Sequence, residues 1–118
     1  MLDHQYFMQR AYQQALKSYN EGGCPIGAVL VRNDGTILGE GHNMRVQGGN
    51  PILHGEMSAL QNAGRQKIYD DTVMYTTLSP CMMCAGTAVQ FKIPLVIIGE
   101  NINFGGNEEF LQIGRAHV

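Results

Sequence analysis

The sequence predicts a single α/β domain in which helices cover both faces of a β-sheet. Segments with helical spacing of apolar residues alternate with short strand-like segments, and the last of these, at residues 95–99, is nearly continuously apolar. Apolar strands that alternate with helices are typical of sheets buried on both faces. The chain has 118 residues, 44% of them hydrophobic and 15% charged, so it is long and apolar enough to form one globular domain.

The first part of the chain is predicted to form a helix followed by a β-hairpin. Apolar side chains between Phe7 and Tyr19 recur at helical spacing, and the two glycines at 22–23 can end that helix. Residues 25–32 and 36–43 have the composition of strands. The sequence Asn-Asp-Gly between them is a strong signal for a tight hairpin.

The second part is predicted to alternate helices and strands. In order, the elements are a helix at 54–64, a strand at 72–78, a helix at 81–91 and a strand at 95–99. On the first of these helices we expect Met57, Leu60 and Ala63 to face inward, and Gly64 can close it.

The composition argues against several classes of protein. The formal net charge is −2 and the isoelectric point is near 6.0, without the basic surplus of proteins that bind phosphate backbones. No apolar run approaches the ~20 residues of a membrane span, and the first ten residues lack the apolar core of a secretory signal. Three cysteines, an odd number, suit a reducing compartment. We therefore expect a cytoplasmic protein without a membrane partner, and we do not expect a nucleic-acid partner.

The sequence TTLSPCMMCAG at residues 76–86 carries the clearest chemical signal. Cys81 and Cys84 lie about one turn apart at the start of a predicted helix, so both sulfurs can face one point. Pro80 favours a helix start, where the helix dipole lowers the pKa of a thiol. Such pairs occur in redox proteins, in structural zinc sites and in catalytic zinc sites. A structural site needs four protein ligands, whereas a catalytic site needs three and an open position.

The third ligand is expected to be His54, which begins the preceding helix in the sequence His-Gly-Glu. A lone histidine before a helix is more often a cap or a solvated residue. Here Glu56 follows two residues later, within reach of the open position, and His-x-Glu followed by Pro-Cys-x-x-Cys is the signature of zinc-dependent deaminases. We therefore predict one zinc ion held by His54, Cys81 and Cys84, with Glu56 as the catalytic acid and base.

With these motifs the chain resembles the cytidine deaminase superfamily, and within it the fungal-type and bacterial cytosine deaminases. The resemblance extends to about Gln112. It is carried by the stretches EGGCPIGAVLV, LGEGHNMR, LHGEMSAL, YTTLSPCMMCAG and VIIGENINF. It implies a three-layer α/β/α fold with a central mixed sheet of five strands, one zinc ion per chain, and a homodimer.

The resemblance also implies a substrate pocket. In the family, the positions of Asn43, Gly55 and Ser79 contact the polar groups of a pyrimidine base, and that of Phe104 packs on its flat face. We expect a zinc-dependent hydrolase that converts free cytosine to uracil and ammonia in pyrimidine salvage. The alternative is a guanine deaminase or a tRNA-specific adenosine deaminase of the same superfamily. The tRNA enzymes usually have His-Ala-Glu instead of His-Gly-Glu and are more basic. A more distant alternative is a zinc-binding or redox module without catalysis.

Other cysteine, histidine and methionine residues are expected to have structural roles. We expect Cys24 in the core, where a small apolar residue is usual in the family, and Met82 and Met83 in packing contacts. His42 is expected to order its loop.

The end of the chain departs from the family. The family continues beyond Gln112 into another strand and helix, whereas residues 113–118 share nothing with it. We therefore expect a deaminase domain at 1–112 that is truncated before its fifth strand, and a non-native tail at 113–118.

Overall fold

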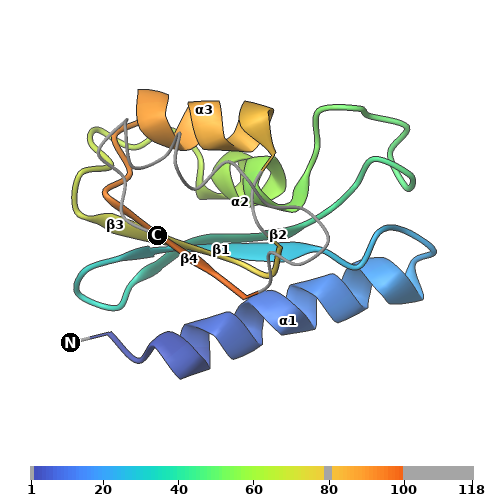
Figure 1. Ribbon diagram of the computed structural model, residues 1–118, viewed down its shortest axis with the longest axis horizontal. Helices are drawn as coiled ribbons and strands as arrows, with labels where there is room; N and C mark the ends of the chain where they lie inside the picture. The colour runs from blue at the N-terminus through green and yellow to red at the C-terminus, as the bar shows by residue number, and fades with distance from the viewer. Residues whose placement is uncertain (1, 79–80, 100–118) are drawn as a thin grey trace.

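In the computed structural model, a mixed sheet with the order β2-β1-β3-β4 separates helix α1 from helices α2 and α3 (Figure 1). The structure describes residues 2–78 and 81–99. Within this part of the chain the elements are α1 (His4–Asn20), β1 (Gly27–Arg32), β2 (Ile37–His42), α2 (Gly55–Ala63), β3 (Thr72–Thr76), α3 (Met82–Gln90) and β4 (Leu95–Ile98). The predicted α/β/α layering is confirmed for these residues.

The strand directions bring several loops to one edge of the sheet. β1 is antiparallel to both β2 and β3, and β3 is parallel to β4. Gly27 at the start of β1 therefore pairs with His42 at the end of β2, and Ala28 pairs with Thr76 at the end of β3. The segments before β1, after β2 and after β3 consequently meet at the same edge.

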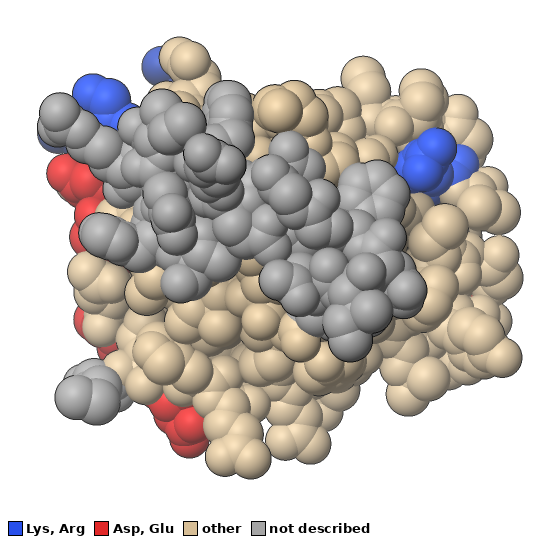
Figure 2. Space-filling view, viewed as in Figure 1, with Lys and Arg blue, Asp and Glu red and all other residues tan. Residues whose placement is uncertain are grey.

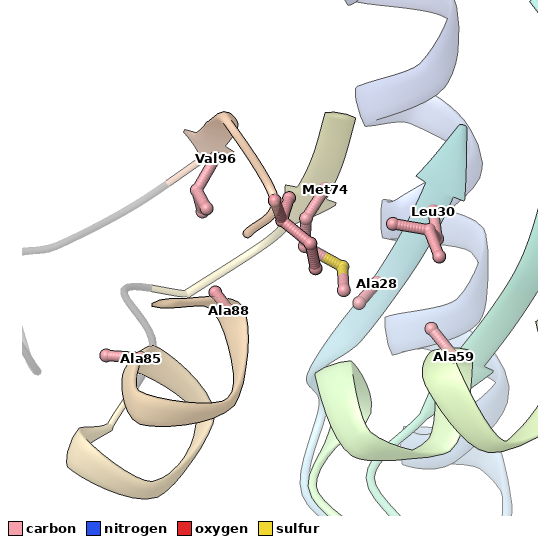
Figure 3. Packing of buried hydrophobic residues seen from close by; sticks show 8 residues of the cluster. Ala28, Leu30, Ala59, Met74, Ala85, Ala88 and Val96 are labelled. Carbon is pink, nitrogen blue, oxygen red and sulfur yellow. The ribbon is translucent and has the colours of Figure 1, made fainter. Parts of the chain in front are cut away.

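Buried hydrophobic side chains form a cluster on each face of the sheet. Beneath α1, Phe7 and Ala11 pack against side chains of β1 and β3, including the fully buried Tyr75. On the opposite face, Figure 3 shows small side chains of α2 and α3 around Met74 and Leu30. The alternation of strand side chains between the two faces explains why these strands are apolar along their whole length.

Helix α2 lies unusually close to β2 because two glycines leave room for its main chain. A Cβ atom at Gly39 or Gly41 would overlap main-chain atoms of α2, at Ala59 in both cases. The predicted helix and its closure by Gly64 are confirmed. Its predicted inward face is confirmed in part, because Leu60 and Ala63 are partly buried and pack against the core cluster. The most buried side of the helix, however, carries Glu56, Ser58 and Ala59.

The methionine prediction for α3 is wrong. Met82 and Met83 are 56% and 37% exposed, because the buried face of α3 consists of Cys84, Ala85 and Ala88.

The predicted fifth strand, the boundary at residue 112 and the tail at 113–118 lie outside the described residues. Among the helices that are described, none is both long and apolar enough to cross a membrane.

Candidate metal centre and catalytic pocket

Three potential metal ligands converge between the starts of α2 and α3. The ligand atoms of His54, Cys81 and Cys84 all lie within 4.8 Å of one another, and the His54 Nδ1 and Cys81 Sγ atoms are 3.4 Å apart. His54 is the N-cap of α2, Cys81 is the N-cap of α3, and Cys84 lies one turn further along α3. The histidine thus meets two cysteines that follow it 27 and 30 positions later in the sequence.

The backbone at both helix starts leaves these side chains available. An N-cap side chain usually accepts a hydrogen bond from an N–H group of the first helical turn. His54 and Cys81 have the extended backbone of an N-cap, yet neither side chain makes such a bond within the described chain. Imidazole and thiol are poor capping groups, and here they face each other instead.

The donor set fits zinc. Two thiolates and a neutral imidazole are ligands that zinc prefers, and three protein ligands are typical of a catalytic site. Burial, followed by the positive charge of Arg45, lowers the pKa of His54, which favours the neutral imidazole that binds a metal. In the metal-free protein, burial and the nearby Glu56 carboxylate raise the pKa of Cys84. A bound dication reverses this preference, because a coordinated thiol loses its proton.

Glu56 lies behind the ligands on the first turn of α2. Its side chain is almost inaccessible, at 6% exposure for the residue, and it faces Cys84. Burial raises the pKa of this carboxyl above its ordinary range. A carboxyl that is poised to hold a proton close to a metal site has the property required of an acid–base group.

A cavity of about 120 Å³ opens onto these groups. It is lined by Cys24, Ile26, Asn43, Arg45, His54, Glu56, Leu78 and Cys81. Asn43 is 2% exposed and follows β2, and its loop returns so that the Met44 N–H donates to the Leu53 carbonyl at 2.8 Å. This bond places Asn43 and His54 at the same cavity although the loop between them is long.

The structure brings together most of the predicted site. The cavity is lined by His54, Cys81, Glu56 and Asn43, and Cys84 completes the ligand group. Gly55 is the buried first residue of α2 and packs against Ile26. Ser79 and Phe104 lie outside the described residues.

Other lining residues were not predicted. Ile26 directly precedes β1 and Leu78 follows β3, so both lie at the sheet edge where Asn43 lies. That shared edge is the signal that would have found them. The prediction that Cys24 lies in the core is wrong, since this residue is half-buried and lines the cavity.

Residues 1–100 match the family model of the cytidine and deoxycytidylate deaminase zinc-binding region. The chain belongs to this family. The predicted cofactor agrees with it, because the family is zinc-binding and the His54, Cys81 and Cys84 group is positioned for a metal. The predicted fold is confirmed as well.

The chain resembles members of this family that are named for three different deaminase activities. It is 55% identical over 106 residues to a cytosine deaminase of Candida albicans, a match that covers 88% of this chain and 71% of the relative. It is 42% identical over 113 residues to a tRNA-specific adenosine deaminase of Streptococcus pyogenes, covering 92% and 70%. Among solved structures, a guanine deaminase from Bacillus subtilis superposes with a TM-score of 0.79 at 32% identity, covering 86% of this chain and 67% of that one.

Proposed function

We propose that this protein is a zinc-dependent hydrolase that converts free cytosine to uracil and ammonia. The observation that supports this proposal most is the cavity in which the buried Glu56 and Asn43 share walls with His54 and Cys81. The 55% identity to a cytosine deaminase supports the choice of base. The small cavity, about 120 Å³, suits a single-ring base better than the drug-sized ligands of pockets of about 300–1,000 Å³.

His54, Cys81 and Cys84 would hold the zinc ion. When bound, zinc lowers the pKa of a water molecule to about 7 and so supplies a nucleophile at neutral pH. His54 contributes a neutral nitrogen, and the two thiolates balance the charge of the dication.

Glu56 is the group that moves protons in this proposal. Its carboxylate takes one proton from the attacking water and passes it to the N3 atom of the base. It then takes the second proton from the same oxygen, now bonded to C4, and gives it to the amine that leaves from C4. One C–O bond forms and one C–N bond breaks, so cytosine and water become uracil and ammonia. Because Glu56 is buried, bulk water cannot take over this role.

Asn43 is proposed to orient the base. Its side-chain Oδ1 accepts a hydrogen bond from the Arg45 main-chain N–H at 3.0 Å, which leaves the Nδ2 donor for the polar edge of a substrate. Ile26 and Leu78 supply apolar walls of the same cavity, as a flat base requires. By resemblance, Gly55, Ser79 and Phe104 complete this pocket.

The experiment is a deamination screen of the zinc-loaded protein against cytosine, cytidine, guanine, adenine and a tRNA anticodon stem-loop, with ammonia release as the readout. We expect turnover of cytosine and strong loss of it in Asn43→Ala.

The alternative is a tRNA-specific adenosine deaminase, which the 42% identical relative favours. On the face shown in Figure 2, the Lys and Arg side chains that are drawn in blue are few and scattered, which does not favour that alternative. Turnover of the stem-loop but not of cytosine would refute the proposal.

We also propose a homodimer in the cytoplasm that serves pyrimidine salvage. An open apolar groove runs between α2 and α3, lined by Ile52, Met57, Leu60 and Phe91 among others, and such a surface is typical of an interface. Light scattering of the wild type and of Ile52→Arg tests the dimer, since a charge in the groove should yield monomers. Growth of a pyrimidine-requiring strain on cytosine tests the salvage role, and a fluorescent fusion tests the location.

A further inference from the structure

The loop that carries Asn43 is fastened to the end of helix α1. Ser18, in the last turn of α1, has no exposed surface, and its hydroxyl donates to the main-chain carbonyl of Asn43 at 2.9 Å. Ser18 is 25 residues away from Asn43 and does not line the cavity. A buried hydroxyl in a helix more often bonds to a carbonyl of its own helix, so this long-range bond needs an explanation.

Gln47 extends the same connection. Its Nε2 group donates to the Ser18 hydroxyl at 3.1 Å and to the Glu21 carboxylate at 3.2 Å. The Glu21 carboxylate also accepts from the His42 Nε2 atom at 2.9 Å. One polar network therefore joins the end of α1 to both sides of Asn43, at His42 and at Gln47.

The space for Gln47 is provided by the turn that ends α1. A Cβ atom at Gly23 would overlap the Gln47 side-chain amide, so the amide lies directly against that turn. The Gln47 Oε1 atom is the one buried side-chain oxygen or nitrogen without a partner among the described residues. The two bonds that its Nε2 group donates, to Ser18 and to Glu21, hold the side chain in this place.

Asn43 is held at its other polar groups as well. Its main-chain N–H donates to the Ile26 carbonyl at 2.9 Å, and its Oδ1 accepts from the Arg45 N–H at 3.0 Å. With the Ser18 bond to its carbonyl, the backbone of Asn43 is fixed on both sides. The one polar group left at this residue is the Nδ2 donor, which is the atom proposed above to contact the base.

We propose that Ser18 and Gln47 are positioning residues that hold Asn43 in the orientation that binds the base. This inference rests on the proposed role of Asn43. Ser18 and Gln47 act through Asn43 and not on the substrate, because neither lines the cavity. A network that only stabilised the fold would leave substrate recognition unchanged when it is weakened.

The first test is a double-mutant cycle on the zinc-loaded protein. Ser18→Ala should lower kcat/KM for cytosine about 2- to 10-fold, the loss expected for one hydrogen bond, mainly through a higher KM. In the Asn43→Ala background, Ser18→Ala should change kcat/KM by less than about 1.5-fold, because residues that act through one another are not additive. Thr72→Val is the matched control, since it removes a buried hydroxyl that donates to the Tyr69 carbonyl away from the cavity. It should leave KM unchanged.

The second test does not depend on activity. Amide hydrogen exchange should become faster at Arg45, whose N–H is held by Asn43, in Ser18→Ala but not in Thr72→Val. Gln47→Ala, at a half-buried side chain, should have the same effects and serves if Ser18→Ala does not fold.

Additive losses in the cycle, or unchanged exchange at Arg45 in both the Ser18 and Gln47 variants, would overturn the inference. If the parent protein lacks cytosine turnover, the proposed function fails, and the exchange experiment alone decides whether Ser18 and Gln47 hold Asn43.

Discussion

Replacing Glu56 by glutamine tests proton transfer by this residue separately from zinc binding and folding. The change exchanges one carboxylate oxygen for an amide group and keeps the size and shape of the side chain. Glu56 is 6% exposed and faces Cys84, so the amide occupies the same buried space. It can still donate and accept hydrogen bonds, but it cannot take up and release a proton.

The expected loss follows from that single deficit. General acid–base catalysis contributes typically about 10²–10⁴-fold to a rate, which corresponds to about 3–5 kcal/mol of transition-state stabilisation. Because Glu56 is 6% exposed, bulk water has little access to its position and is a poor substitute base. We therefore expect kcat to fall by at least about 100-fold, while zinc content and the affinity for cytosine change little.

Stability should not fall in this variant. Burial raises the pKa of the Glu56 carboxyl because a buried charge is unfavourable, and the neutral amide avoids this cost. The melting temperature of Glu56→Gln should thus equal or exceed that of the parent.

The assay combines ammonia release with metal analysis and thermal unfolding. Glu40→Gln is the matched control, because Glu40 pairs with Arg10 and does not line the cavity, so its kcat should stay unchanged. If Glu56→Gln kept more than about a tenth of the parental kcat with a full complement of zinc, less than the smallest typical acid–base contribution would have been lost. Glu56 would then not be the proton carrier.

Three other perturbations test the metal centre and the fold. Cys81→Ser should reduce zinc below one ion per chain and remove the stabilisation that added zinc gives the parent, as metal analysis and melting curves would show; undiminished zinc would contradict the ligand assignment. Gly41→Ala should destabilise the protein by at least about 1–3 kcal/mol, because its Cβ overlaps Ala59. The control is Gly86→Ala in α3, where no described atom lies within 4 Å of the new Cβ; it should be neutral or stabilising by up to ~1 kcal/mol. Equal denaturant midpoints of the two glycine variants would contradict the predicted difference in stability. The third perturbation is alkaline pH, because burial raises the pKa of Tyr75 to about 12. The contribution of Tyr75 to stability is fully present below the ordinary pKa of about 10 and is lost as pH rises from 10 through 12. Urea unfolding should show this loss in the parent and not in Tyr75→Phe.

The local elements were predictable because their signals are local. Periodicity, the Asn-Asp-Gly turn at 33–35 and the closing Gly64 each depend on a few neighbouring residues, and the structure has all of these features. The ligand group was predictable for a different reason. Zinc restricts the donor types, and the two motifs His-x-Glu and Pro-Cys-x-x-Cys mark His54, Cys81 and Cys84 as one set.

The rest of the site depends on contacts between distant segments. Ile26 and Leu78 have no chemical signal of their own, and they line the cavity only because β1 and β3 are antiparallel neighbours. The inward face of α2 was predicted only in part for a related reason. Hydrophobicity favoured Met57 over Glu56 as the buried residue, but Glu56 lies on the buried side of the helix, where it faces Cys84 of α3.

Strand β2 sets the relative positions of two parts of the proposed catalytic machinery. Asn43 continues directly from the end of β2, while α2, which carries Glu56 and begins after His54, packs its main chain onto Gly39 and Gly41 of the same strand. With side chains at those two positions α2 would have to move away from the sheet, and His54 and Glu56 would move with it, whereas Asn43 would not. The two glycines therefore maintain the distance between Asn43, which is proposed to bind the base, and the groups that are proposed to act on it. For this reason Gly41→Ala should impair turnover beyond its effect on stability, although Gly41 is not a lining residue of the cavity.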